Sequence, residues 1–334
     1  MTNRMLITGS AGFIGSHVFG LLADGPRDGG VLGLDLVADA SPGRVYRADI
    51  RQPAELRRIA SVAQPKTVVH LAARADVVLP FEALGDLMLT NVNGTINVLD
   101  GLRPERIVLA SSSAVYGNAS GRSALARWSC VSPVGAYGIS KAAAELACAE
   151  WARQTGGIAV SLRFGNVVGR RCRGLIAYLV NHAVAHPDAD QPAQLRGNGA
   201  VVRDYVPVRY VASVIQRAAQ VAVPNGSSLM LNVGSGRGLT NRTVATIVQR
   251  VLASRGVKLT MVFSRSVAPG EAWHLVLNTA ATNRKLELPS PTDDEVVAAI
   301  EEATVDYLCR GPQMNGTVPG SSLADRDIAT GSAP

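Results

Sequence analysis

Tyr137 and Lys141 are the residues whose types and spacing indicate a chemistry most directly. Residues four apart lie on one face of a helix, so a phenol and an ammonium group would face the same side. A free tyrosine has a pKa of about 10 and is a poor base at neutral pH. Lowering this pKa to about 7 requires roughly 4 kcal/mol of preferential stabilisation of the phenolate. A lysine cation about 4 Å away in a partly solvated site supplies interaction energy of that order. The pair is therefore expected to move a proton.

The N-terminal segment Thr8–Gly15 supplies a second part of that chemistry, a glycine-rich turn of the pattern Gly9-x-x-Gly12-x-x-Gly15. The first glycine permits a tight strand-to-helix turn, the second lets the backbone approach a pyrophosphate, and the third lets the helix pack on the sheet. The N-terminus of the helix then faces the phosphates. Together with the tyrosine, this turn predicts a phenol beside a bound nicotinamide, where a proton moves as a hydride moves.

Asp35 ends the next predicted strand, 20 residues after Gly15. A carboxylate there can accept from both hydroxyls of an adenine ribose and would repel a 2′-phosphate, which favours NAD over NADP. The alternative is a solvated aspartate at a strand end. Asp49 and Ile50 follow a further short strand and are candidates for the adenine edge, although an aspartate in a turn needs no ligand.

A serine-rich segment, Ala110–Gly117, follows another predicted buried strand. Ligands of such sheets bind at the carboxyl ends of the strands, so a hydroxyl there can hydrogen-bond the same substrate oxygen as the tyrosine. A serine run that merely ends a strand is the alternative.

The elements that must position these residues alternate along the chain. Strands are predicted at 4–8, 31–35, 67–72, 106–111 and 158–164, and helices at 13–23, 53–63, 84–101 and 137–155. This order predicts an α/β fold, a Rossmann-type doubly wound parallel sheet with helices on both faces.

After Asn166 the alternation weakens, with a sheet piece at 229–233 and helices at 209–222 and 240–254. We expect an NAD-binding Rossmann domain over 1–165, which the chain re-enters near 200–235. A smaller C-terminal substrate lobe is expected mainly over 166–310. The segment 311–334 is rich in Gly, Pro, Ser and Asn without periodicity and predicts a disordered tail.

Composition restricts the class of partner. The net charge of +7 comes mainly from arginines scattered along the chain, and aromatic residues are only 4%. A nucleic-acid interface needs a clustered basic face with interleaved aromatics, so no nucleic-acid partner is expected, and an anionic small substrate fits the charge better.

The cysteines Cys130, Cys148, Cys172 and Cys309 show no CxxC spacing and do not cluster with the histidines, so no metal site is predicted. There is no signal-peptide pattern and no apolar run of about 18 residues, which predicts a cytoplasmic protein without membrane contact.

With these motifs the sequence resembles the extended short-chain dehydrogenase/reductases, and among them the NAD-dependent nucleotide-sugar epimerase/dehydratase family of the UDP-glucose and UDP-glucuronate 4-epimerase type. The matching segments span about residues 4–290 in the family's order, which is far more specific than any one motif. They are Thr8–Gly15, Asp35, Asp49-Ile50, His70–Ala73, Asn91–Thr95, Ser111–Gly117, Tyr137–Lys141, Arg163–Asn166, Arg203–Tyr205 and Asn232–Gly236.

The resemblance implies a role for each matching position. The catalytic residues would be Ser112, Tyr137 and Lys141, with Tyr137 as acid/base and Lys141 as its electrostatic partner and ribose ligand. The implied cofactor-binding residues are Gly9, Gly12, Phe13, Ile14, Gly15, Asp35, Asp49, Ile50, Leu71, Ala72, Ala73, Asn91, Ser111, Tyr137, Lys141 and Phe164, the last near the nicotinamide. The implied substrate-binding residues are Ser112, Ser113, Tyr137, Asn166, Arg173 and Arg203, of which Arg203 would contact the diphosphate.

The resemblance also narrows the reaction. Dehydratases of this family follow the catalytic hydroxyl with an acidic pair, decarboxylating relatives place a Glu there, and 3,5-epimerising relatives use a Cys in this segment. This chain has Ser113 and Ala114. The implied activity is NAD-dependent 4-epimerisation of a UDP-sugar, glucose/galactose or glucuronate/galacturonate, through a transient 4-keto intermediate.

Two other functions are compatible with the sequence. An NAD(P)H-dependent nucleotide-sugar 4-ketoreductase would share the catalytic residues but consume its cofactor. A redox-sensing regulatory protein would keep the fold without catalysis, although such proteins usually lack the Tyr/Lys pair. The resemblance further implies a homodimer formed through 84–101 and 137–155.

Three arginines, Arg170, Arg171 and Arg173, follow Asn166, close to where the sugar should lie. Arg173 aligns best with a position that reads a uronic carboxylate in UDP-glucuronate 4-epimerase-like relatives, and bidentate guanidinium–carboxylate pairing gives a physical reason. The alternative is that these arginines line the diphosphate path or face solvent.

Two segments depart from the family pattern. Relatives commonly carry Arg before Pro-Gly-Asp where this chain has Ala268–Glu271, so either Arg265 substitutes or nucleotide binding differs. Val78 stands where relatives often have Arg.

Overall fold

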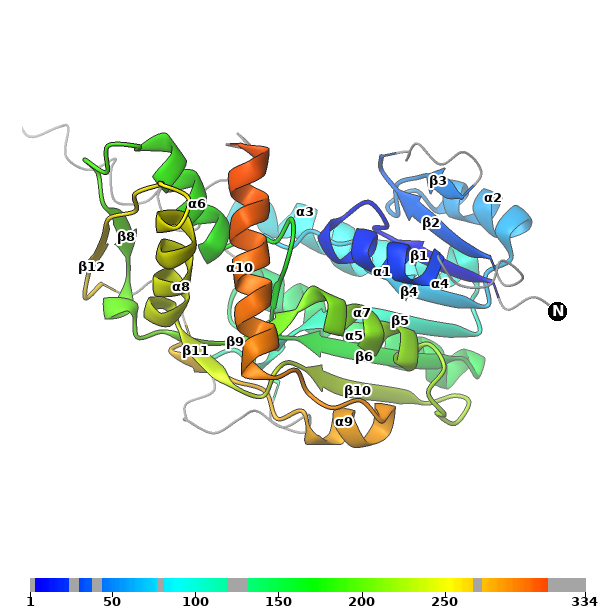
Figure 1. Cartoon of the computed structure of the whole chain (residues 1–334). Helices are drawn as coiled ribbons and strands as arrows, with labels where there is room; N and C mark the ends of the chain where they lie inside the picture. The colour runs from blue at the N-terminus through cyan, green and yellow to red at the C-terminus, as the bar shows by residue number, and fades with distance from the viewer. Residues whose placement is uncertain are drawn as a thin grey trace, which may run out of the picture.

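A large parallel sheet takes six of its strands from the N-terminal half of the chain and one, β10, from further along, and a smaller lobe packs at one end of it (Figure 1). The structure is a computed structural model and describes residues 4–23, 30–37, 44–76, 81–118, 131–266 and 272–311. Within them the large sheet has seven strands in the order β10-β6-β5-β4-β1-β2-β3, all paired in parallel. Its strands are β1 (Met5–Thr8), β2 (Val31–Asp35), β3 (Val45–Arg47), β4 (Thr67–His70), β5 (Arg106–Ser112), β6 (Ile158–Phe164) and β10 (Ser228–Val233).

Successive side chains along each strand point to opposite faces of the sheet and pack into two separate hydrophobic cores. Leu6 packs with helices α2 (Pro53–Ala63), α4 (Gly94–Leu102) and α5 (Gly135–Thr155) on one face of the sheet. Ile7 packs with α1 (Phe13–Ala23) and α7 (Val208–Ala218) on the other face. Strands buried on both faces explain why their sequences are continuous apolar runs. The predicted Rossmann-type α/β fold is confirmed.

The predicted helix over 84–101 is interrupted by a wider turn. It begins with a 3-10 turn (Phe81–Ala83) and α3 (Leu84–Met88), passes through a π-helical turn (Leu89–Asn93) and continues as α4. Such π turns are frequent at functional sites. Here the π turn carries Asn91, which is fully buried.

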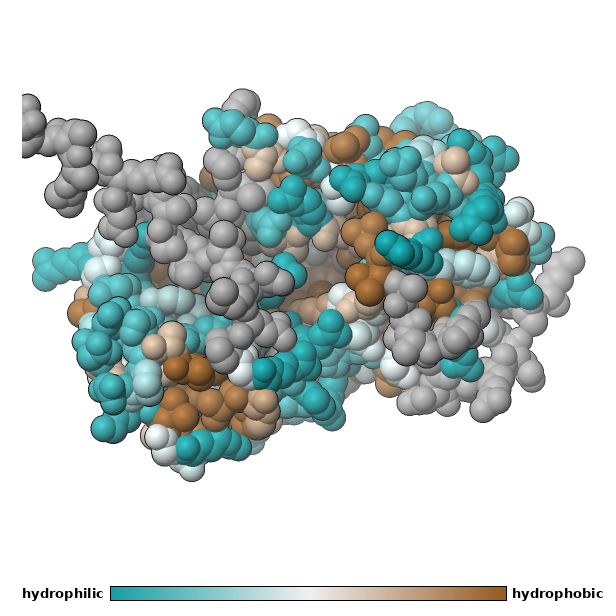
Figure 2. All heavy atoms as spheres, turned by 90° about the horizontal axis from the view of Figure 1, so that it is seen from above, coloured by the Kyte–Doolittle hydropathy of each residue, from teal (hydrophilic) through white to brown (hydrophobic). Residues whose placement is uncertain are grey.

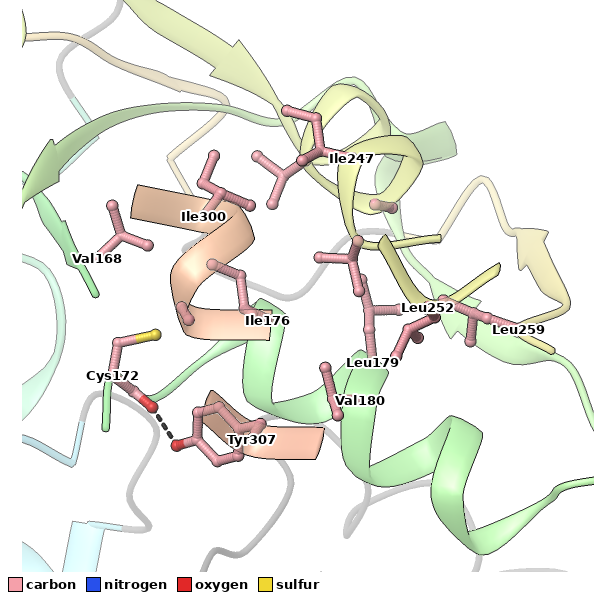
Figure 3. Close-up of a cluster of buried hydrophobic side chains, with 14 of the residues drawn as sticks. Val168, Cys172, Ile176, Leu179, Val180, Ile247, Leu252, Leu259, Ile300 and Tyr307 are labelled. Carbon is pink, nitrogen blue, oxygen red and sulfur yellow. Dashed lines mark hydrogen bonds between the residues drawn. The ribbon is translucent and has the colours of Figure 1, made fainter. Parts of the chain in front are cut away.

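The smaller lobe holds α6 (Leu175–Ala185), α8 (Asn241–Ala253) and α10 (Asp293–Arg310) around one apolar cluster (Figure 3). Ile176, Leu179 and Ile300 meet in it, and Tyr307 OH donates to Cys172 O at its edge. Short strands close the lobe: β7 (Asn166–Val168), β9 (Val202–Pro207), β11 (Gly238–Thr240) and β13 (His274–Leu275) in one sheet, and β8 (Ala193–Leu195) with β12 (Met261–Phe263). The other short helices are α9 (Ala280–Leu286) and 3-10 turns at Ser113–Tyr116 and Gly197–Gly199.

Two lobe helices, α6 and α10, were not predicted from the sequence. Helix α10 stands between the lobe and the large sheet (Figure 1) and begins with a capping box formed by Thr292 and Glu295. The predicted disordered tail lies outside the described residues apart from Gly311. Among the helices that are described, none is long and apolar enough to cross a membrane.

The strands of the large sheet point their carboxyl ends toward the lobe (Figure 1). Seen from above, the surface is hollowed between the two parts (Figure 2). Ligands of doubly wound sheets bind at this end of the strands, so the hollow is where the predicted site should lie.

Candidate functional site

Tyr137 and Lys141 lie on the first turns of α5, beside the carboxyl end of β5. Ser112 lies close enough to the Tyr137 hydroxyl to lower the pKa of that phenol. Lys141 Nζ donates to Ala110 O at 2.9 Å and lies 5.9 Å from the centre of the Tyr137 ring. Ser112 Oγ also accepts from Ala114 N at 3.1 Å, which fixes the start of the 3-10 turn. The structure thus brings the three predicted catalytic residues together.

The ionisation of this pair differs from the sequence expectation. Burial raises the pKa of Tyr137, and the nearby Ser112 lowers it only in part. Lys141 is 5% exposed, and burial lowers its pKa to about 8. In the protein without cofactor, Lys141 does not lower the pKa of Tyr137 as expected. The reason is that both groups lose solvent and Nζ is directed at a backbone carbonyl.

A buried charged network lies one turn further along α5. Glu145 accepts from Arg163 Nε at 2.9 Å, from Arg163 Nη2 at 2.6 Å and from Ser111 Oγ at 2.5 Å. Arg163 Nη1 donates to Tyr116 OH at 3.0 Å, which in turn donates to Asn232 Oδ1 at 2.6 Å. The network ties α5 to β5, β6 and β10. It also turns the Ser111 hydroxyl toward Glu145, so the cofactor role of Ser111 stays a prediction.

The glycine-rich turn is as tightly built as its pattern indicates. Gly9 has a φ of +71°, and a Cβ there would lie 2.7 Å from Ala72 N. A Cβ on Gly15 would lie 1.9 Å from Gly9 O, so α1 could not sit where it does with any other residue. A Cβ on Gly12 would lie 3.1 Å from the same oxygen.

Asp35 ends β2 beside this turn. Its Oδ2 accepts from Ala11 N at 2.9 Å and its Oδ1 from Val37 N at 3.3 Å. Next to it, Ser10 Oγ is buried and has no hydrogen-bond partner among the described residues. A Cβ on Gly33 would lie 2.6 Å from that oxygen, so the strand leaves room for Ser10.

Asp49 and Ile50 are engaged within the protein. Arg51 Nη2 donates to Asp49 Oδ2 at 2.6 Å and holds the pKa of that carboxyl below its usual range. Ile50 is buried against α4, where a Cβ on Gly94 would lie 2.7 Å from Ile50 Cδ1. Their contact with an adenine stays a prediction.

Asn91 holds the loop that follows β4. Its Oδ1 accepts from Arg74 N at 2.8 Å, and its Nδ2 donates to Arg74 O at 2.9 Å and to Ser140 Oγ at 3.0 Å. Ser140 Oγ donates to Tyr137 O at 2.8 Å. Asn91 therefore links this loop to the helix turn that carries the tyrosine, and its predicted cofactor contact is not tested by these bonds.

The remaining predicted cofactor residues surround the same end of the sheet. Leu71 N and Ala72 N donate to Thr8 O and Thr8 Oγ1 at 3.1 and 3.2 Å, which runs the Leu71–Ala73 loop beside the glycine-rich turn. Phe164 pairs in register with Ser112 and is buried. Phe13 packs against the lobe core and Ile14 against the core beneath α1 and α7.

The predicted substrate residues come from more exposed segments. Asn166 is exposed and pairs in register with Tyr205 on the neighbouring strand β9. Arg203 Nη1 donates to Ala272 O at 2.7 Å. Arg173 is exposed on the segment before α6, whereas Ser113 is buried beneath the site. Val78 and Ala268–Glu271 lie outside the described residues, and Arg265 is exposed.

Asp204 is a structural centre that sequence reasoning missed. Its carboxylate accepts from Ser235 N and Ser235 Oγ, both at 2.7 Å, and from Gly236 N and Leu277 N, both at 3.1 Å. Burial raises its pKa, and these four donors oppose that shift. The signal was present in the matched Arg203–Tyr205 segment, where an acid sits inside a buried strand.

The residues present fit NAD. Gly9, Gly12 and Gly15 carry no Cβ that could block a diphosphate at the start of α1, and Ser10 Oγ is a buried polar atom with no partner among the residues that the structure describes. The turn would hold the diphosphate, and Asp35 would hold the adenine ribose.

Comparison with known proteins agrees with this geometry. The chain is 29% identical over 270 residues to the putative UDP-glucose 4-epimerase of Methanocaldococcus jannaschii, which covers 75% of this chain and 83% of that protein. It is 27% identical over 275 residues to the dTDP-glucose 4,6-dehydratase of Neisseria gonorrhoeae, with 75% and 78% covered. The crystal structure of UDP-glucose 4-epimerase from Brucella ovis in complex with NAD is 25% identical and superposes with a TM-score of 0.79, covering 92% of this chain and 99% of that one.

The model of the NAD-dependent epimerase/dehydratase family matches residues 5–234, more than half of the sequence. The matched region contains the glycine-rich turn, Asp35 and the three residues Ser112, Tyr137 and Lys141. The chain therefore belongs to the NAD-dependent epimerase/dehydratase family and uses NAD as its cofactor.

Proposed function

We propose that this chain is an NAD-dependent 4-epimerase of a UDP-sugar, acting on the glucose/galactose or the glucuronate/galacturonate pair. The observation that carries the proposal is that Ser112 and Tyr137 lie together beside Lys141. The two residues after Ser112 are Ser113 and Ala114, and neither is an acid. The named relatives include UDP-glucose 4-epimerases, which supports the same reaction.

In this reaction Tyr137 takes the proton of the sugar 4-hydroxyl, and Ser112 hydrogen-bonds the same oxygen. The Lys141 ammonium stabilises the phenolate form of Tyr137, which takes this proton and is regenerated when the proton is given back. NAD supplies hydride acceptance and return when bound. The keto sugar then turns within the cleft, and Tyr137 gives the proton back. Because the hydride also returns to the sugar, no external reductant is consumed.

The same residues disfavour elimination of water. A dehydratase needs an acid next to the hydroxyl of Ser112, and Ser113 is a buried serine while Ala114 has no ionisable group. Glu145 lies on the same helix as Tyr137, but its carboxylate is bound by Arg163 and Ser111. An activity like that of the Neisseria dehydratase is therefore not proposed.

The proposal is tested by incubating the purified protein with UDP-glucose, UDP-glucuronate, UDP-N-acetylglucosamine or GDP-mannose, with no cofactor added. NMR is expected to show one of the two UDP-sugar epimer pairs approaching equilibrium. A Tyr137→Phe variant is the matched control, since it keeps the ring and removes the hydroxyl. If no sugar is epimerised but a 4-keto nucleotide sugar is reduced as NADH or NADPH disappears, the ketoreductase alternative holds.

The proposal includes a homodimer formed by α4 and α5. Four large apolar side chains on these helices and the π turn are exposed: Leu89, Ile96, Ile139 and Leu146, the last at 72%. Helices α4 and α5 pack side by side, so a second copy can cover both. Leu146→Glu is expected to shift sedimentation from dimer to monomer, and an unchanged sedimentation coefficient would contradict this assembly.

A further inference from the structure

Arg171 of the smaller lobe reaches across to the glycine-rich turn. Its Nη2 donates to Ala11 O at 3.0 Å and its Nη1 to Ser16 Oγ at 3.1 Å. Ala11 lies within the turn, and Ser16 lies on the first turn of α1. The guanidinium group therefore sits at the part of the Rossmann fold where the diphosphate of a dinucleotide binds.

The backbone at Arg171 is fixed so that the side chain points this way. Its φ is +68°, a left-handed conformation that a residue with a Cβ seldom adopts. The Arg171 N–H donates to Asp306 Oδ2 at 2.9 Å. Asp306 is 8% exposed and also accepts from Arg170 Nε at 3.2 Å and Arg310 Nε at 3.0 Å. Helix α10 thus anchors the segment that aims Arg171 at the turn.

The guanidinium group of Arg171 is not paired with the carboxylate of its own cluster, Asp306. Asp306 is the carboxylate of this cluster, and its side-chain partners are Arg170 and Arg310. Among the described residues, the contacts of the Arg171 guanidinium are a carbonyl and a hydroxyl, both neutral. Two of its five N–H donors make these contacts, and the other N–H groups can donate to a further acceptor.

The surface beside the turn is positively charged. Ser16, His17, Arg170, Arg171 and Arg310 line a hollow of about 230 Å³ next to α1. Helix α1 has no acidic residue in its first turn. The positive end of the helix and the arginines therefore act together on any anion held at the turn.

We propose that Arg171 is a ligand of the NAD diphosphate, contributed by the smaller lobe to the dinucleotide site. A guanidinium pairs with phosphate oxygens through several parallel N–H bonds, which an ammonium group cannot reproduce. Because Arg171 belongs to the smaller lobe, this contact would make the affinity for NAD depend on how the lobe packs against the glycine-rich turn. The proposal concerns cofactor binding and is independent of which sugar reaction the site performs.

The test compares ligands with and without the diphosphate in the Arg171→Gln and Arg171→Lys variants. Affinities for NAD and ADP are measured by calorimetry on protein freed of bound cofactor, and for adenosine by displacement of NADH fluorescence. Arg171→Gln is expected to weaken NAD and ADP about tenfold and to change adenosine less than about twofold, because only the first two carry the diphosphate. Arg171→Lys should fall between, and the loss should shrink as salt rises from 50 to 500 mM since the group is exposed.

Arg209→Gln is the matched control. Arg209 is an exposed arginine on α7 that pairs with Glu302, so the substitution makes the same charge change away from the turn. It should leave all three affinities unchanged. Equal weakening of adenosine and ADP would overturn the proposal, because Arg171 would then only hold the turn in shape. Unchanged NAD and ADP affinity in a variant with the wild-type melting temperature would overturn it as well.

Discussion

The two sides of the cleft are built differently. On the sheet side, Tyr137, Lys141 and Ser112 lie on α5 and the end of β5, above a network in which Glu145 and Arg163 are 7% and 2% exposed. On the lobe side, Asn166 is exposed on β7 and Arg173 is exposed on the segment that joins β7 to α6. The reacting groups are thus fixed by buried hydrogen bonds, while the groups that would read the substrate face solvent.

This difference predicts two kinds of mutational response. Losses on the sheet side should be large and should affect every substrate, because buried polar groups lose their partners. Losses on the lobe side should be smaller and should depend on the ligand, since exposed charges are screened and readily rearranged.

The largest effect is expected for Tyr137→Phe. Removing the hydroxyl takes away the acid/base group and should lower kcat about a thousandfold or more. The variant should still retain NAD, because the glycine-rich turn and Asp35, which would hold the diphosphate and the adenine ribose, are untouched. Steady-state kinetics with the sugar that NMR identifies, and calorimetry with NAD, measure the two effects separately. A kcat within tenfold of wild type would show that another group moves the proton.

Glu145→Gln should produce the next largest effect, on stability. The substitution leaves the buried Arg163 guanidinium without its charged partner, which typically costs about 3 kcal/mol or more in the free energy of unfolding. Urea denaturation at pH 7 measures it. The double variant Glu145→Met/Arg163→Met removes both charges and should recover part of that loss. Equal destabilisation in the single and double variants would show that the ion pair is not the cause.

The sequence predicts the sheet side well because its residues belong to regular elements. The strands that contain Ile7 and Val69 are buried on both faces, and such strands are short apolar runs that a pattern search detects. Tyr137 and Lys141 are found from their spacing on one helix. Glu145 lies one further turn along the same face, but its pairing with Arg163 depends on how α5 packs on β6. That packing is not visible in either segment alone.

The lobe side is predicted poorly for the opposite reason. Strands β7 and β11 have three residues each, too few for an alternating pattern. Helix α10 carries a start signal in the sequence, the capping box of Thr292 and Glu295, but it lies next to a polar tail that lacks helical periodicity. Arg171 was expected near the sugar, and it points instead to the glycine-rich turn because its backbone is left-handed and held by Asp306.

A third effect should appear as a loss of stability in acid. His70 is fully buried between Thr8 Oγ1 and Thr95 Oγ1, at 2.7 and 3.0 Å, and burial lowers its pKa to about 3, with the Lys141 charge adding to the shift. Below pH 6.5 the unfolded chain binds a proton that the folded chain does not, so stability falls as the pH drops. Between pH 7 and 4.5 this amounts to about 2.5 kcal/mol.

Urea denaturation of the wild type and of His70→Gln at the two pH values measures this contribution. The neutral amide cannot titrate, so the variant should lose less stability between pH 7 and 4.5 than the wild type does. An identical loss in both proteins would assign the acid sensitivity to other groups.

The smallest and most selective effect is expected on the lobe side, for Arg173→Ala. If UDP-glucuronate is the substrate and Arg173 pairs with its carboxylate, the exposed contact is worth about 1 kcal/mol, which is a five- to tenfold rise in KM. The kcat should stay near that of the wild type, because Tyr137 and Ser112 are unchanged. Turnover of UDP-glucose, which has no carboxylate, should not respond. Arg209→Ala serves as the control, since Arg209 is an exposed arginine that pairs with Glu302 away from the site. Equal effects of both variants on both sugars would mean that the arginines act through general charge. The contrast between a fixed reacting side and a substrate-reading side would then not hold.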